Sequence, residues 1–268
     1  MNVLLREIQV REDIWVLTLG EEHIETSYGA NCTAIIGSES VLVVDPLIAP
    51  ALARLVENAI AGRTNLPGRF VVLTHHHTDH ALGAGWFASR GATVAAHPAC
   101  RDAMAIEHRG LIEARRQLPR LSELFRDAEP YVPGWIVTDP VELDVGGSKA
   151  RIFHPGPGHT RGDLVVHLPH QSVVVCGDLV SVGYHVNYED AAVENLENGI
   201  RTLRELGAQT YVPGHGPPGG AEILDEQFHY HAALARASST EEILRLFPGY
   251  ALTEVVPQAL AVWRKRAV

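Results

Sequence analysis

The chain has 268 residues, 46% of them hydrophobic and 20% charged, with a formal net charge of −10 at pH 7. This composition is typical of a globular protein with a sizeable core and excludes an intrinsically disordered chain. The negative charge argues against a nucleic-acid partner, because affinity for phosphates depends on clustered lysines and arginines.

The first half of the chain alternates predicted strands and helices. Apolar runs predict strands at 41–44, 70–73 and 93–96, and helices at about 50–61 and from about residue 81. The segment 98–134 is predicted to be helical, with breaks at Gly110 and Pro119. It is far longer than a usual connection, so we expect a helical insertion or a lid whose apolar face covers the site.

The second half begins with β-type patterns and ends in helices. Strands are predicted at 141–145, 149–153, 163–168, 172–176 and 210–212, and helices at 191–206, 220–246 and 252–266. Strand-rich halves with helices outside favour an α/β fold, a four-layered αβ/βα sandwich. We expect residues 1–268 to form a single domain that ends in C-terminal helices at 220–268.

A cluster of metal-binding side chains follows the strand at 70–73. The motif places His75, His77, Asp79 and His80 within six residues. Neutral imidazoles and carboxylates are standard ligands of zinc and related divalent ions. In a tight loop, alternate residues can face one ion and the remaining pair another, so this motif predicts two metal sites.

Three later motifs strengthen the prediction of a metal centre. They are Pro-Gly-Pro-Gly-His-Thr ending at Thr160, Cys-Gly-Asp ending at Asp178, and Pro-Gly-His-Gly ending at Gly216. In type and order these motifs, together with the strand-end Asp45, resemble those of the metallo-β-lactamase superfamily, with a metal site like that of glyoxalase II and the β-lactamases. The resemblance runs from about residue 31 to 220.

The resemblance implies a role for each matching residue. It gives His75, His77 and His159 to a first metal, Asp79, His80 and His215 to a second, and Asp178 to both as a bridge. Asp79 and Asp178 are therefore also the expected catalytic residues. The implied cofactors are two divalent ions, zinc first, with iron or manganese as alternatives.

Further residues are expected around the metals. Asp45 is placed to accept the second N–H of a ligand histidine, although it could equally cap the end of its strand. His76 should point away from the metals. Tyr184 and His185, with Tyr188, follow Asp178 closely and are expected to form a wall that binds substrate.

Taken with the resemblance, these features predict a binuclear hydrolase in which a metal-bound hydroxide attacks a carbonyl substrate: an ester, lactone, thioester or β-lactam. One alternative is a mononuclear iron persulfide dioxygenase using only His75, His159 and Asp178. The other is a non-catalytic binding module on the same fold. The substrate itself is left open, because the fold supports many chemistries.

Location and partners follow from weaker signals. Three cysteines, at 32, 100 and 176, form no disulfide framework, and the N-terminal residues lack the pattern of a signal peptide. No apolar run reaches the roughly 18 residues of a membrane span. We expect a cytoplasmic protein with a small-molecule substrate and no membrane partner, and the oligomeric state is left open.

Overall fold

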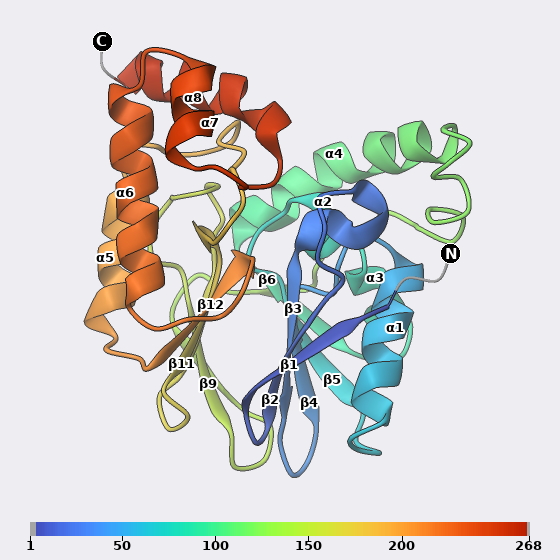
Figure 1. The fold of residues 1–268 in the computed structure, drawn as a ribbon. Helices are drawn as coiled ribbons and strands as arrows, with labels where there is room; N and C mark the ends of the chain where they lie inside the picture. The colour runs from blue at the N-terminus through green and yellow to red at the C-terminus, as the bar shows by residue number, and fades with distance from the viewer. Residues whose placement is uncertain (1–3, 267–268) are drawn as a thin grey trace.

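Two β-sheets face each other at the centre of the computed structural model, which describes residues 4–266 (Figure 1). The first sheet has the strand order β1 (Arg6–Arg11), β2 (Ile14–Thr18), β3 (Asn31–Ile36), β4 (Val41–Val44), β5 (Gly68–Val72), β6 (Thr93–Ala96) and β7 (Trp135–Ile136). The second has the order β12 (Thr210–His215), β11 (Val173–Ser181), β10 (Val165–Leu168), β9 (Lys149–Phe153) and β8 (Val141–Asp144).

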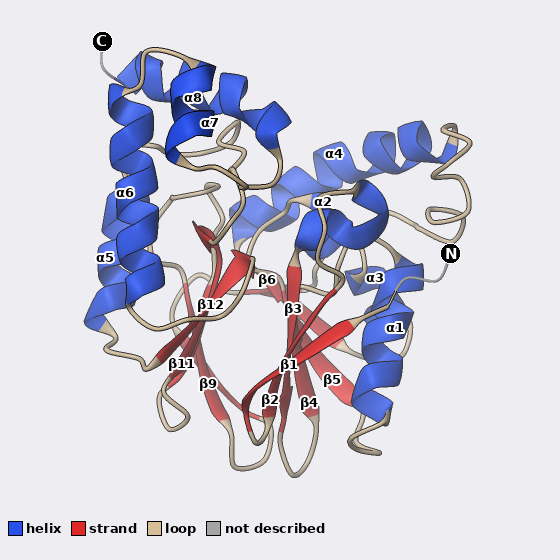
Figure 2. Ribbon diagram, viewed as in Figure 1, coloured by secondary structure: helices blue, strands red, loops and turns tan. Residues whose placement is uncertain are grey.

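Some helices flank the outer sides of the paired sheets and others lie above one end of the strands, as Figure 2 shows. Those of the first half are α1 (Pro50–Ala61), α2 (Thr78–Ala81), α3 (Ala84–Ala88) and α4 (Pro98–Arg116). Those of the second half are α5 (Leu196–Glu205), α6 (Glu222–Arg236), α7 (Thr240–Leu246) and α8 (Val256–Arg266). Two short 3₁₀ turns, Ile24–Gly29 and Thr253–Val255, complete the described elements.

Burial on both faces of the strands explains the layers. In β4, Val41 and Val43 belong to the cluster that packs against α1, α3 and α4, whereas Leu42 and Val44 face the second sheet. Successive side chains of a strand point to opposite faces, so a run of four apolar residues fits a sheet covered on both sides. On the far side, α5 and α6 cover the second sheet. The predicted four-layered αβ/βα sandwich is confirmed.

Strand direction brings distant segments to one edge of the sandwich. Strands β4, β5 and β6 are parallel neighbours, as are β11 and β12. The carboxyl ends of parallel strands meet at the same edge, where sites in α/β sheets usually form. Asp45 follows β4, His75 lies just beyond β5, Asp178 lies in β11 and His215 ends β12. Four motifs far apart in sequence are therefore neighbours.

The segment 98–134 differs from its prediction in two ways. Helix α4 passes through Gly110 without a break, because a helical glycine costs only about 1 kcal/mol and the helix is held by Met104 and Ile112 in the core. Beyond Arg116 the chain continues in turns rather than in a second helix. Most of its apolar side chains pack on the first sheet: Met104, Ile112 and Phe125 are at most 1% exposed and belong to the core there. Leu111, in contrast, borders the cavity at the site, so a lid formed by this segment stays a prediction.

Other boundaries also differ from the expectations. Strands β1 to β3 were not predicted, and β11 extends to Ser181 rather than ending at Cys176. The predicted helix at 220–246 is two helices, because the chain is extended at Ala237 and the hydroxyl of Ser239 caps α7 by accepting the N–H of Glu242. None of the helices in the described part of the chain is long and apolar enough to cross a bilayer.

Candidate metal centre

The histidine motif occupies the junction between β5 and α2. His75 and His77 lie in the connection, and His77 immediately precedes α2, so the helix starts earlier than the expected residue 81. Asp79 and His80 lie inside the single turn of α2. The change from extended connection to helical turn separates the two pairs of side chains. The motif is thus half loop and half helix, where a loop alone was expected.

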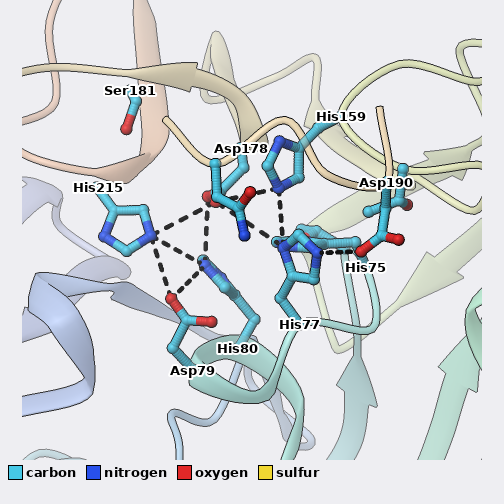
Figure 3. Close-up of polar contacts among 12 residues, drawn as sticks. His75, His77, Asp79, His80, His159, Asp178, Ser181, Asp190 and His215 are labelled. Carbon is cyan, nitrogen blue, oxygen red and sulfur yellow. Dashed lines mark hydrogen bonds and ion pairs between the residues drawn. The ribbon is translucent and has the colours of Figure 1, made fainter. Parts of the chain in front are cut away.

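The described residues at this edge form four overlapping groups of closely spaced donor atoms, and two of these groups contain the expected ligands (Figure 3). The first group is His75, His77, His159 and Asp178, and the second is Asp79, His80 and His215; within each group the donor atoms lie within 4.8 Å of one another.

The carboxylate of Asp178 lies between the two groups. Its Oδ2 is 3.5 Å from Nε2 of His159 and 3.5 Å from Nε2 of His215, and its Oδ1 is 3.2 Å from Nε2 of His80. One carboxylate therefore contacts both sets, and the structure brings together all seven residues that were singled out from the sequence.

The outer nitrogens of four histidines contact protein oxygens. Nδ1 of His80 lies 3.0 Å from Oδ2 of Asp45, and Nδ1 of His75 lies 3.0 Å from the hydroxyl of Thr74. Nδ1 of His215 lies 3.0 Å from the carbonyl oxygen of Tyr28, and Nε2 of His77 lies 3.0 Å from Oδ2 of Asp190. Each contact leaves the other nitrogen of the ring facing the cluster.

Charge is distributed unevenly over the site. Burial lowers the pKa of His75 and brings that of His159 to about 3, so these rings are neutral at pH 7. Burial also acts to lower the pKa of His80 and His215, but the nearby carboxylates, Asp178 foremost, outweigh it and raise both, to about 9 for His215. The negative charge of the carboxylates around His80 and His215 therefore favours binding of a cation, whether a proton or a metal ion.

The donor set fits divalent metal ions. Nε2 of His75 is buried and has no hydrogen-bond partner, and Nδ1 of His77 lies 2.9 Å from Nε2 of His159, two ring nitrogens aimed at one point. Five imidazoles and two carboxylates are the ligand types that zinc, iron and manganese accept. Hydrogen bonds from the outer nitrogens, as seen here, are the usual support for histidine ligands.

A cavity of about 580 Å³ opens onto this cluster. Asp79, Asp178 and His215 line its floor, and its walls come from α4 and from the C-terminal segment: Glu107, Leu111, Arg115, Leu252, Glu254 and Val255. Leu111 lies in the segment 98–134 that was expected to cover the site, whereas the local sequence around Leu252 and Val255 does not differ from that of an ordinary turn or helix start.

The expected substrate wall is only partly present. His185 lines the cavity, is 1% exposed, and holds Nδ1 at 2.9 Å from the hydroxyl of Tyr230 while its Nε2 has no hydrogen-bond partner. Tyr184 instead packs its ring on His215, at 5.4 Å between ring centroids. Tyr188 is fully buried, with its hydroxyl 2.8 Å from Nε2 of His231, so the expectation that it lines the cavity is wrong.

Asp190 is the clearest contact that sequence reasoning missed. Besides His77 it faces Nε2 of His76 at 3.5 Å; His76 belongs to neither of the two donor groups but forms a third group with His77 and Asp190. Hydrogen bonds from both rings hold the pKa of Asp190 well below its ordinary value. The only local hint was an acidic pair, Glu189 and Asp190, soon after Asp178.

Comparison with known proteins agrees with this geometry. Residues 26–215 match the metallo-beta-lactamase superfamily. The chain belongs to that superfamily. The matched part contains every residue of the two donor groups, whereas the cavity wall formed by Leu252 and Val255 lies outside it.

Individual relatives of this metallo-β-lactamase superfamily member are distant. It is 26% identical over 228 residues to a type 2 metallo-beta-lactamase of Bacillus sp. (strain 170), covering 81% of this chain and 78% of that protein. It is 24% identical over 208 residues to the 2,4-dinitroanisole O-demethylase subunit alpha of Nocardioides sp. (strain JS1661), covering 77% of this chain but only 56% of that protein. The solved metallo-beta-lactamase from Pontibacter korlensis superposes with a TM-score of 0.71 at 19% identity, over 85% of this chain and 99% of the other. That structure supports the fold alone.

Proposed function

We propose that this chain is a binuclear metal-dependent hydrolase that acts on a small carbonyl substrate: an ester, lactone, thioester or β-lactam. The observation that supports it is the pair of donor groups with one carboxylate between them. In this proposal His75, His77 and His159 hold one ion, Asp79, His80 and His215 hold the other, and Asp178 contacts both.

Two divalent ions, zinc first and iron or manganese otherwise, would supply a hydroxide at neutral pH, because a bound dication lowers the pKa of water to about 7. The protein residues fix where that chemistry takes place. Asp178 and Asp79 line the cavity floor, so we assign them catalytic roles as well as ligand roles. Asp45 orients His80 through their 3.0 Å contact.

The substrate would enter the cavity between α4 and the C-terminal segment. His185 is proposed to bind substrate from the cavity wall, with its ring held by the 2.9 Å contact between Nδ1 and the hydroxyl of Tyr230. Tyr184, also expected to bind substrate, is instead proposed to support His215 from behind. A substrate can contact both apolar and polar walls here, since Leu111 and Val255 border the same cavity as Arg115.

Two alternative functions would require fewer of these metal-binding residues. A mononuclear iron dioxygenase would need only His75, His159 and Asp178, and the complete second group of Asp79, His80 and His215 argues against it. A non-catalytic binding module has no need of seven clustered donors, which are costly to bury without a cation.

Metal analysis combined with a hydrolysis screen tests the proposal. Purified protein is analysed for zinc, iron and manganese and assayed on esters, lactones, thioesters and β-lactams, with Asp178→Ala as the matched inactive control. We expect two ions per chain and turnover of at least one substrate class. One iron per chain with oxygen consumption would favour the dioxygenase, and absence of both metal and turnover would favour the binding module.

We also propose a cytoplasmic location. Cys32, Cys100 and Cys176 are all unpaired and buried, as suits a reducing compartment. Fractionation of cells that produce the protein tests this, and recovery from an oxidising compartment would contradict it.

A further inference from the structure

The two ring nitrogens of His77 contact different partners. Its Nδ1 lies 2.9 Å from Nε2 of His159, on the side of the first donor group, and its Nε2 lies 3.0 Å from Oδ2 of Asp190, on the side of the cavity wall (Figure 3). A neutral imidazole carries one N–H, and the ring nitrogen that contacts an acceptor is the one that keeps it. An acceptor at Nε2 leaves the lone pair on Nδ1.

The position of Asp190 is held by its neighbours in the chain. The N–H of Ala191 donates to the carbonyl of Tyr188, whose side chain is fully buried. The N–H of Ala192 donates to the carbonyl of Gly158 at 2.9 Å, which ties this loop to the one that carries His159. Asp190 therefore sits on a braced loop, although its own side chain is 43% exposed.

The same carboxylate also faces the residue before His77. Nε2 of His76 lies 3.5 Å from Asp190 and 3.7 Å from Glu107. From the opposite side, Nε2 of His108 in α4 donates to the carbonyl oxygen of His76 at 2.7 Å. The connection that carries His76 and His77 is thus held between α4 and the loop of Asp190.

We infer that Asp190 is a positioning residue for the metal centre, whose carboxylate holds His77 in the tautomer that turns Nδ1 toward His159 and Asp178. This rests on the proposed function only in taking His77 as a metal ligand. Asp190 orients a histidine of the first donor group, as Asp45 orients His80 of the second. It differs in lying at the cavity wall rather than in the core.

The test measures metal affinity by chelator competition on Asp190→Ala, Asp190→Asn and Asp190→Glu. The control is Glu189→Gln, which removes one negative charge from the adjacent position. We expect Asp190→Ala to bind one of its two zinc ions about 10- to 100-fold more weakly, the usual effect of losing such a partner. Asp190→Asn, whose amide oxygen still accepts, and Asp190→Glu should fall between Asp190→Ala and wild type, and Glu189→Gln should match wild type.

A second readout separates positioning from a general structural role. In the metal-free protein, nitrogen chemical shifts should show His77 protonated at Nε2, and this preference should weaken in Asp190→Ala while the unfolding temperature changes little. Unchanged zinc affinity in Asp190→Ala would overturn the inference. So would a third ion bound by wild type and lost in the variant, since Asp190 would then be a ligand. Two bound ions without hydrolysis would instead reject the proposed function and leave the role of Asp190 intact; no bound metal would reject both.

Discussion

Asp45 Oδ2 lies 3.0 Å from Nδ1 of His80 in the interior of the protein, where Asp45 is 2% exposed and His80 fully buried. The same carboxylate accepts hydrogen bonds from the backbone N–H of Thr74, at 2.8 Å, and from its hydroxyl, at 2.6 Å. One side chain therefore fixes both the ring of His80 and the backbone just before His75. Asp45 has a φ of 56°, which is unfavourable for a residue with a side chain and is retained because these contacts hold it.

Replacing Asp45 should separate its two roles. In Asp45→Ala, three donors lose their acceptor, and each buried unsatisfied group costs about 1–3 kcal/mol, so we expect a marked loss of unfolding free energy. Asp45→Asn keeps an acceptor of nearly the same shape. It should remain folded yet bind the second metal about 10- to 100-fold more weakly. Denaturant unfolding and chelator competition measure the two effects, and an Asp45→Asn protein with wild-type affinity would contradict the assigned role.

The candidate metal ligands could be identified from the sequence because residues of their types are uncommon at those positions. Histidines and aspartates that follow apolar runs of the sequence, such as His75 and Asp178, have few structural reasons to be there. The partners of these side chains were not visible. The carbonyl of Tyr28 that contacts His215 is a backbone group that any residue would supply, and Asp190 reaches His77 only through the path of a long loop.

The fold was predictable to a similar degree. Covered parallel strands such as β4 stand out as continuous apolar runs, whereas Ile14–Thr18 and Asn31–Ile36 are short runs that periodicity cannot distinguish from buried helix. In helix α4 the sequence predicted a break that the structure does not have. Gly110 is a local break signal, but the packing of Met104 and Ile112 in the core keeps the helix continuous.

Asp178 should be essential for activity but not for folding. Because its carboxylate contacts His80, His159 and His215, its loss removes the group shared by both donor sets. We expect Asp178→Ala to lower kcat/KM by about 100-fold or more, since each dication contributes several kcal/mol to such reactions. His215→Ala should instead reduce occupancy at the second site only. Wild-type turnover and two ions per chain in Asp178→Ala would show that the residue is no bridge.

Removing the metal should lower both activity and stability. The two donor groups concentrate buried imidazoles and carboxylates whose charges a cation balances. A ligand that binds only the folded state at 100 times its Kd stabilises it by about 2.7 kcal/mol. We therefore expect chelation to abolish hydrolysis and lower the unfolding temperature, and zinc to restore both. If turnover persisted after elemental analysis had verified removal of the metals, hydrolysis could not depend on them.

The metal-free protein should lose stability in mild acid, in part through His108. Burial lowers the pKa of His108 to about 4, while an unfolded histidine titrates near 6.5. Between these values the unfolded chain binds more protons, so the free energy of unfolding rises with pH from about 4 to about 6.5 and then levels off. His108→Gln, which keeps a donor for the carbonyl of His76, should reduce this slope by up to about 1.4 kcal/mol per pH unit. Urea unfolding at a series of pH values measures it, and equal slopes would contradict the assignment.

Substrate selectivity should depend on the C-terminal wall. Leu252 and Val255 border the cavity and lie outside the part of the chain that matches the superfamily. The backbone there is anchored to the site. The N–H of His185 donates to the carbonyl of Ala251, and the N–H of Ala251 donates to that of Gly183, both at 2.9 Å. A change in these side chains should therefore alter the wall without loosening the segment.

We expect Leu252→Ala and Val255→Ala to keep two metal ions while lowering kcat/KM more for substrates with a large apolar group than for small ones. An apolar wall contact discriminates by about 1–3 kcal/mol, so the ratio between two such substrates should change by about 10-fold or more. Leu246→Ala, at a residue of α7 that is 51% exposed, serves as the control because it removes the same atoms away from the cavity. Equal losses for large and small substrates would mean that the wall supports the fold rather than selecting the substrate, and unchanged kinetics in both variants would mean that substrate does not contact it.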